Sequence, residues 1–179
     1  MRTETYTRNI YTLDEVKDKA IEVNWNINVE YDWFKWVCFD AAEIGLYLNE
    51  FDVDRDNHCS GELLASCREV ADRIMIHHGE TCDTYKLAKE FLAEAEPLII
   101  WLHRVEESRY DIYHRGGVAD TYRKKETALA KLERKFKRDL LMEYAVILKK
   151  DYEYLTSPEA IEATLRTNAY EFNEDGTIA

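Results

Sequence analysis

The segment YRKKETALAKLERKFKRDLLMEYAVI, residues 122–147, decides the fold. Its apolar residues recur at steps of three and four, with one position skipped at Lys125, which places them on one face of a helix. The members of this apolar face are Tyr122, Leu129, Leu132, Phe136, Leu140, Tyr144 and Ile147. The pattern predicts one long helix whose apolar face packs against a partner helix.

Basic residues occupy the opposite face of this helix. At 100° per residue the cations gather there, whereas acidic residues such as Glu126 and Glu133 stay close to the apolar face. The whole chain has a formal net charge of −12, but residues 115–156 hold 11 basic and 7 acidic residues, net +4, so the remainder carries −16. We name six of these cations the basic stripe: Arg123, Lys124, Lys131, Arg134, Lys135 and Arg138. A charge distribution this uneven is typical of a protein that binds a charged partner.

The preceding segment predicts the partner helix. Thr84 is a candidate N-cap, helical periodicity continues to about Tyr113, and Pro97 is expected to kink or split the helix. Residues 114–117, HRGG, are expected to form the tip of a hairpin. Residues 81–156 are therefore predicted to be a long antiparallel helical hairpin.

The N-terminal part predicts shorter elements. Residues 3–12 have the composition of a short edge strand, and Thr12 with Glu15 fits a capping box that begins a helix. A second helix is expected over residues 30–44, ended by Gly45, whose freedom at positive φ suits a helix C-terminus.

A small β element is expected next. From Leu46 the apolar period changes to two, which predicts a strand to Val53 with one slip near Glu50. A turn at residues 56–57 leads to a return strand over residues 58–64. A helix over residues 65–78, stopped by Gly79, is then expected to follow.

The C-terminal part returns to the start of the chain. Ser157 as N-cap and Pro158 at the first helical position predict a helix to about Asn168, followed by a strand at residues 170–172 and a turn at residues 175–176.

These elements predict an α+β, predominantly α-helical fold with a long antiparallel helical hairpin and a small β element. Residues 1–179 are interpreted as one domain. Its parts are a mixed α/β body (1–80), the hairpin (81–156) and a C-terminal helix and strand that return to the body (157–179).

Composition indicates a cytoplasmic protein. The N-terminus has no apolar region of the kind a secretory signal needs, and no apolar run approaches the length of a membrane span. The four cysteines, Cys38, Cys59, Cys67 and Cys82, show no CxxC spacing, so free thiols are expected. No cofactor is expected.

Three patterns carry a chemical alternative. Asp52, Asp54 and Asp56 resemble the start of a calcium loop, but position twelve is Leu63 and not a bidentate glutamate, so aspartates on the wet face of a strand are the plainer interpretation. A second set has zinc-ligand types without compact spacing: His58, Cys59, Cys67, His77, His78 and Cys82.

Nucleophilic catalysis is the third pattern. Cys82 with His78 is the one local thiol and imidazole pair, whereas Cys38 lies in an apolar stretch that predicts an inert thiol. The chain has no glycine-rich phosphate loop, GxSxG or HExxH motif. We therefore expect a non-enzymatic protein, with no catalytic and no metal-binding residues.

Four stretches of the chain are similar to small proteins from prophages and mobile elements: YTLDEV (11–16), FDVDR (51–55), HGETCDTY (78–85) and YEFNEDG (170–176). The resemblance extends over nearly the whole chain. The family is mostly uncharacterised, and some members carry an automatic label as the antitoxin of a toxin–antitoxin system. The resemblance implies a phage-type accessory protein that acts in the cytoplasm of a host bacterial cell by stoichiometric binding, as anti-CRISPR proteins do.

The first functional hypothesis is an inhibitor that binds a CRISPR nuclease or its guide-RNA complex. The basic stripe is the expected contact set for RNA or for an acidic lobe of the partner. The plainer interpretation of the stripe is a solvated helix face. It is also compatible with a contact to a second copy of the chain, and no membrane partner is expected.

Two alternatives use other residues. An antitoxin-like protein would bind a toxin through Trp33, Phe34 and Trp36, or through the acidic strand that carries Asp52, Asp54 and Asp56. A metal-dependent enzyme would use Asp52, Asp54 and the neighbouring histidines.

Overall fold

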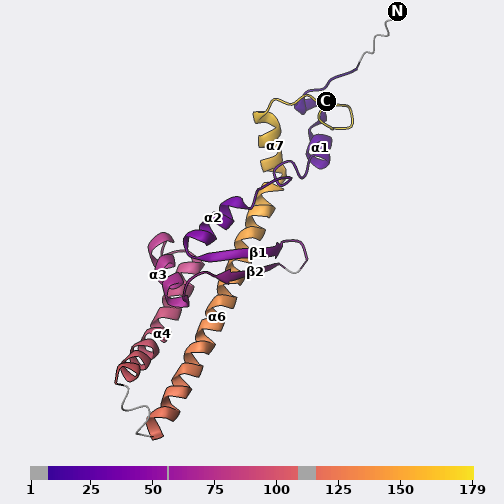
Figure 1. Ribbon diagram of the computed structural model, residues 1–179. Helices are drawn as coiled ribbons and strands as arrows, with labels where there is room; N and C mark the ends of the chain where they lie inside the picture. Colours follow the sequence, from indigo (N-terminus) through magenta and orange to yellow (C-terminus); the bar gives the residue numbers. More distant parts are fainter. Residues whose placement is uncertain (1–7, 56, 109–115) are drawn as a thin grey trace, which may run out of the picture. The chain divides into compact units, whose positions relative to one another are not determined.

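The computed structural model describes residues 8–55, 57–108 and 116–179 and is α+β and predominantly helical, as predicted (Figure 1). The elements in chain order are α1 (Leu13–Val23), α2 (Lys35–Glu43), β1 (Leu46–Asp52), β2 (His58–Leu63), α3 (Cys67–His77), α4 (Asp83–Glu107), α6 (Gly116–Leu155) and α7 (Pro158–Thr167).

Contacts group the described residues into two compact units. The first unit joins the chain up to Lys35 with residues 148–179, and the second unit is residues 36–147. Helix α6 contributes to both units. This grouping cuts across the three predicted segments (1–80, 81–156 and 157–179), and the interpretation of residues 1–179 as one domain stays a prediction.

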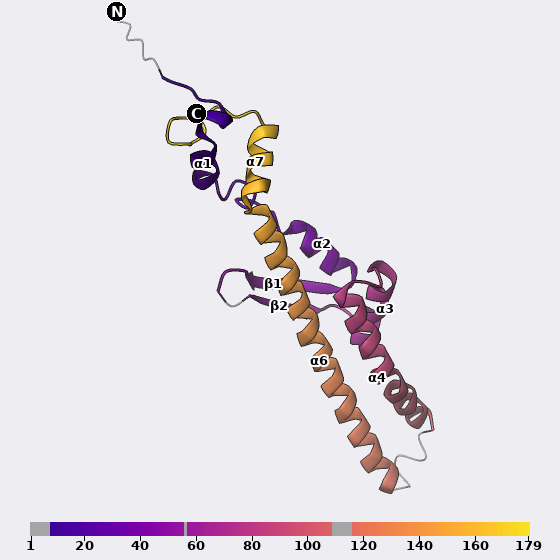
Figure 2. The same ribbon diagram turned by 180° about the vertical axis from the view of Figure 1, so that it is seen from behind.

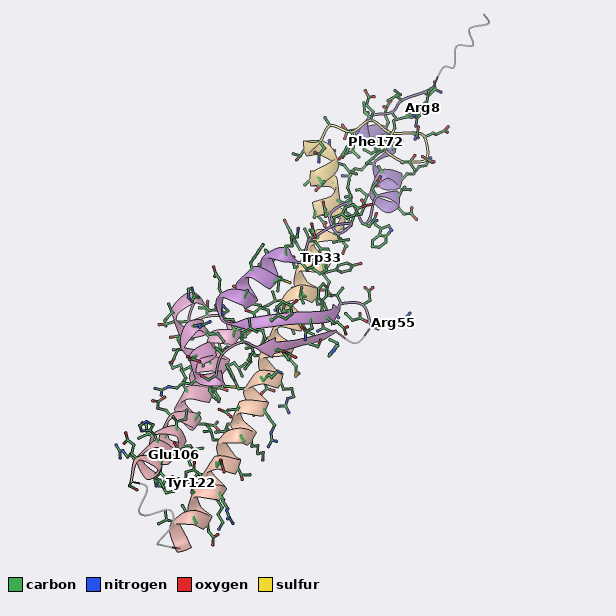
Figure 3. The ribbon with its side chains drawn as sticks, viewed as in Figure 1. Arg8, Trp33, Arg55, Glu106, Tyr122 and Phe172 are labelled. Atoms are coloured by element: carbon green, nitrogen blue, oxygen red, sulfur yellow. The ribbon has the colours of Figure 1, made fainter. Side chains whose placement is uncertain are left out.

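The predicted helical hairpin is present in the second unit as α4 and α6. Near its end the Tyr122 hydroxyl donates to Glu106 Oε1 at 2.5 Å, and Figure 3 shows these two side chains on facing helices. Further along, Phe91 stacks on Phe136 with ring centroids 4.5 Å apart. Because the α4 residue number falls as the α6 number rises, the two helices are antiparallel.

The apolar face of α6 is buried as predicted. Phe136, Leu140 and Tyr144 are buried, and the other members of the face are partly buried. The Tyr144 hydroxyl finds a polar partner in this environment because it donates to Asp40 Oδ2 at 2.7 Å. Burial and this hydrogen bond both raise the pKa of Tyr144.

Helix α4 differs from the expectation at its start, because its N-cap is Cys82 and not Thr84. Of the two expectations for Pro97, a kink or a split, the split is wrong, because the helix continues across this residue. The Thr84 side chain is buried and its hydroxyl is hydrogen-bonded to His78 Nδ1 at 2.7 Å, so it is not available to cap the helix. The predicted end at Tyr113 and residues 114–115 of the predicted tip lie outside the described residues.

The predicted β element is a two-stranded antiparallel sheet. The register runs from Leu46 opposite Leu63 to Asp52 opposite His58, with an irregularity between Leu48 and Glu50 where the sequence predicts a slip. Both strands run across α6 in the two opposite views (Figures 1 and 2).

Helix α2 is shorter than predicted, because it begins at Lys35 and not at Glu30. Asp32 has φ +56°, in the left-handed region, and a residue there cannot continue a right-handed helix. The stretch before Lys35 forms turns instead, including a hydrogen bond from the Lys35 N–H to the Asp32 carbonyl at 3.0 Å. Gly45 has φ +84° and follows the end of α2, as predicted.

Capping residues set several helix starts. The Glu15 carboxylate accepts from the Thr12 backbone N–H at 2.7 Å, which confirms the predicted capping box. Ser157 accepts from the Ala160 N–H at 3.2 Å and caps α7, as predicted. Helix α3 begins at Cys67, later than predicted, because Ser66 is its N-cap.

The first unit has its own small core. Leu13, Val16 and Ala20 of α1 pack with α7 and with Phe172, which lies beside α1 in Figure 3. The predicted strand over residues 3–12 lies partly outside the described residues, and its described part contributes a single β-bridge from Tyr11 to Phe172.

The predicted turn at residues 175–176 is confirmed. Gly176 has φ +88°, and a Cβ there would lie 2.5 Å from the backbone carbonyl carbon of Lys19, so only glycine fits this close approach.

Candidate anion-binding surface

The six cations of the basic stripe are all exposed on α6. Their exposure follows from the apolar face, because a helix that buries Phe136 and Leu140 turns the residues about half a turn away toward solvent. The predicted geometry of the stripe is therefore present. The structure also divides the stripe into two flanks with different neighbours.

One flank meets acidic residues. Lys131 and Lys135 line a groove against α4 in which Glu94 is a further lining residue. Lys135 also lies 3.8 Å from Asp139, four residues along α6. Carboxylates close to these ammonium groups lower the local positive potential, so this flank is poorly suited to an external anion.

The other flank faces the β-hairpin and forms what we call the β2–α6 groove. It is an open groove of about 430 Å³ within the second unit. Its lining consists of residues 57–61 and of six residues on α6, namely Arg134, Lys137, Arg138, Leu141, Met142 and Ala145.

No carboxylate lines the β2–α6 groove in the part of the chain that the structure describes. Among the described residues, Arg134 and Lys137 form no ion pair. Arg138 is paired with the adjacent Asp139, through Nε at 2.9 Å and through a terminal nitrogen at 2.7 Å to the same oxygen. Two unpaired cations and one partly neutralised cation thus share one groove.

Part of the groove lining is apolar. It consists of Leu141, Met142 and Ala145, of which Met142 is 60% exposed. The strand approaches α6 closely at Gly61, where a Cβ would lie 3.1 Å from Leu141 Cδ2 and 2.4 Å from the Tyr47 carbonyl oxygen. The absence of a side chain at Gly61 permits this approach.

Two components of the groove are absent from the predicted site. Lys137 lies on the flank of α6 nearest the apolar face, so the helical projection does not place it in the stripe. The second component is strand β2, which is far from α6 in sequence. A signal for Lys137 is present in the sequence, because Arg134, Lys137 and Arg138 have the three- and four-residue spacing of neighbours on a helix.

The acidic strand end has a structural role. The Asp52 carboxylate accepts hydrogen bonds from the backbone N–H of Asp54 at 2.8 Å and of Arg55 at 3.2 Å, which lower its pKa. In the described ranges no group of three or more His, Cys, Asp or Glu side chains is placed to hold a metal ion, and Asp56 lies outside these ranges. The alternative of a metal-dependent enzyme stays a prediction.

His78 belongs to a polar cluster inside the second unit. Its Nδ1 is hydrogen-bonded to Thr84, and its Nε2 lies 3.6 Å from Asp40 Oδ1, which is beyond hydrogen-bond length. Asp40 in turn accepts from Tyr144. These contacts connect residues of α2, α4 and α6, and the pair of His78 with Cys82 stays a prediction.

The four cysteines are free thiols in the structure, as predicted. Cys59 is buried, and burial raises its pKa to about 11. Burial likewise raises the pKa of Cys67 to about 11, and it raises that of Cys38. Cys82 is exposed.

The three aromatic residues predicted for a toxin interface, Trp33, Phe34 and Trp36, differ in how far they are exposed. Within the first unit Trp33 packs edge-on against Phe34 at 5.9 Å and at a tilt against Tyr152 at 5.5 Å, measured between ring centroids. Both Trp33, which is labelled in Figure 3, and Phe34 are half-buried. Trp36 is 51% exposed and belongs to the second unit. The three residues predicted for a toxin interface are thus divided between the two units.

Comparison with family models, with curated proteins and with solved structures found no match to this chain. Over the ranges described, no helix combines the length and the apolar character that a membrane crossing requires.

Proposed function

We propose that this protein is a non-enzymatic, phage-type inhibitor that binds a host defence nuclease or its guide-RNA complex, as anti-CRISPR proteins do. The contact surface is the part of the basic stripe that lines the β2–α6 groove, Arg134 and Arg138, extended by Lys137. The observation that carries the proposal is the groove itself, where Arg134, Lys137 and Arg138 converge without a lining carboxylate among the described residues.

The charge of the chain supports this mode of action. A nuclease reserves a positively charged channel for nucleic acid, and a chain of net charge −12 is attracted to such a channel. A local basic surface on the same chain then favours one orientation of the complex, because only that surface attracts an anionic part of the partner. The class of partner comes from the resemblance to prophage and mobile-element proteins.

The test is capture of the partner from a host lysate, with and without ribonuclease. A fourfold charge reversal at Lys131, Arg134, Lys135 and Arg138 to Glu should abolish capture. The matched control reverses four exposed cations elsewhere: Lys86, Lys89, Arg104 and Lys150. Both variants change the net charge equally, so loss of capture in both would indicate a general charge effect. Unchanged capture by the stripe variant would contradict the proposal.

An antitoxin-like function is the second candidate. It is favoured by one observation, the exposure of Trp36 (51%) and Phe39 (69%), which lie three residues apart on α2. Co-expression of this protein with the product of the gene next to its own gene tests this function. Rescue of a toxic neighbour by the wild type but not by Phe39→Ser would support it, and rescue by both proteins would contradict a role for this face.

A further inference from the structure

The lining of the β2–α6 groove shows which part of the strand it exposes. Five consecutive residues, 57–61, line the groove. Successive side chains of a strand point to opposite faces, so a groove on one face would be lined by every second residue. A consecutive run indicates that the groove follows the edge of β2 and includes its backbone.

This edge is open within the described residues, because the sheet has two strands and β2 pairs there with β1 alone. The second edge of such a strand presents N–H and C=O groups that can pair with another extended chain. In Figure 2, α6 crosses the strands and continues past β2 on the side opposite β1. The helix therefore provides a second wall beside the open edge.

The side chains of that wall define the chemistry of the occupant. Arg134 and Lys137 provide unpaired positive charge, and Leu141, Met142 and Ala145 provide an apolar surface. An occupant that uses both features carries acidic and apolar side chains together. Single-stranded nucleic acid typically stacks successive bases on several aromatic side chains. The described lining contains no Phe, Tyr or Trp, and its one aromatic ring is the imidazole of His58. The groove thus favours a protein segment over RNA.

We propose that an extended segment of the partner protein, alternating acidic and apolar residues, adds to the open edge of β2 as a third strand. Its backbone pairs with β2, its apolar side chains lie on Leu141 and Met142, and its carboxylates pair with Arg134, Lys137 and Arg138. Strand addition of this kind obtains affinity from main-chain hydrogen bonds and specificity from the side-chain contacts. The inference rests on the proposed function only in requiring a protein partner for the stripe.

The probe for the test is a short, fluorescein-labelled synthetic peptide of alternating valine and glutamate. Fluorescence anisotropy with the full chain measures its binding. NMR spectra of the protein with methyl-labelled methionine show where the peptide binds. The chain has three methionines, of which Met142 lies in the groove and Met75 lies on α3. The proposal expects saturable binding and a shift of the Met142 methyl signal with Met75 unchanged.

Two comparisons separate strand addition from simple charge attraction. The same peptide with its backbone nitrogens methylated at alternate residues keeps its charge but loses strand pairing, and it should bind at least about tenfold more weakly, or about 1.4 kcal/mol. Arg134→Glu with Lys137→Glu should weaken the unmodified peptide by a similar factor. Lys131→Glu with Lys135→Glu, on the flank that meets α4, should leave binding within about twofold, well under the 1.4 kcal/mol that a tenfold change represents.

Three results would overturn the inference. These are a peptide that does not bind, a methylated peptide that binds equally well, and a Met142 signal that moves with a uridine oligonucleotide but not with the peptide. None of these three results has a bearing on whether the basic stripe captures a host partner. Failure of the proposed function has a different signature, since capture would then persist in the fourfold stripe variant.

Discussion

Phe136 links the sequence pattern of the long helix to the stability of the second unit. Its side chain is 2% exposed and stacks on Phe91 of α4, so it holds the two helices of the hairpin together. Leu132, a neighbour on the same predicted face, is only half-buried. The difference shows that helical spacing identifies a face but not the depth of each residue in it.

Phe136→Ala should lower the free energy of unfolding by roughly 3 to 5 kcal/mol, because it removes a buried aromatic ring and leaves a cavity. Urea unfolding followed by circular dichroism measures the change. Met142→Ala is the matched control, since Met142 is 60% exposed and its truncation should cost less than about 1 kcal/mol. Equal effects of the two substitutions would contradict the described packing.

The thiols give a residue-scale prediction that depends on pH. The pKa values of Cys59 and Cys67 are raised to about 11, and the thiolate is the reactive form, so at about pH 8 both should be protonated in the folded protein. Iodoacetamide should then label the exposed Cys82 first, with labelling identified by mass spectrometry of peptides.

The same shifts have a consequence for stability. In the unfolded chain these thiols ionise near the ordinary value of 9.0, below their folded pKa. Their stabilising contribution is therefore complete below about pH 9 and is lost as pH rises toward 11. Rapid labelling of Cys59 in the folded protein at neutral pH would contradict its burial.

At the scale of elements, the sequence predicts what local patterns determine. Apolar spacing predicts α6, the change of period at Leu46 predicts the hairpin with its irregularity near Glu50, and Ser157 with Pro158 predicts the start of α7. These signals are local, because each depends on neighbours within a few residues.

The predictions from sequence that were wrong failed because tertiary contacts decide these positions. The start of α2 was predicted too early because no local signal marks the positive φ of Asp32. Thr84 is a good N-cap residue by type, but its hydroxyl is hydrogen-bonded to His78 on the preceding segment. The β2–α6 groove could not be predicted for a related reason, since its two walls come from segments more than seventy residues apart.

Gly61 tests the contact between β2 and α6. A methyl group at this position would lie 2.4 Å from the Tyr47 carbonyl oxygen and 3.1 Å from Leu141 Cδ2, so Gly61→Ala must displace the strand. We expect a loss of roughly 1 to 3 kcal/mol in the free energy of unfolding. Urea unfolding is the measurement, with Ser60→Ala as control. A neutral Gly61→Ala would show that the strand does not approach α6 this closely.

Across the whole molecule, charge is distributed unevenly. The chain is acidic overall, yet the one groove described between β2 and α6 has no lining carboxylate in the described residues. Electrostatic attraction between exposed charges is screened by salt within about 10 Å at 0.1 M. The proposed interaction should therefore depend on ionic strength.

Capture of the host partner should weaken as sodium chloride rises from about 0.05 M to 0.5 M, because the association of complementary charged surfaces loses its attraction over this range. The measurement is the fraction of partner retained on immobilised protein at each salt concentration. Retention that is independent of salt would indicate an interface dominated by apolar contacts, such as the exposed face of α2.

The most direct test compares the two flanks of the stripe in one experiment. Arg134→Glu with Arg138→Glu changes the groove flank, and Lys131→Glu with Lys135→Glu changes the flank that meets α4. The two double variants have the same net charge, and both should remain folded because exposed charges contribute little to stability. We expect only the groove variant to lose capture of the host partner. Equal capture by both double variants and the wild type would contradict this expectation.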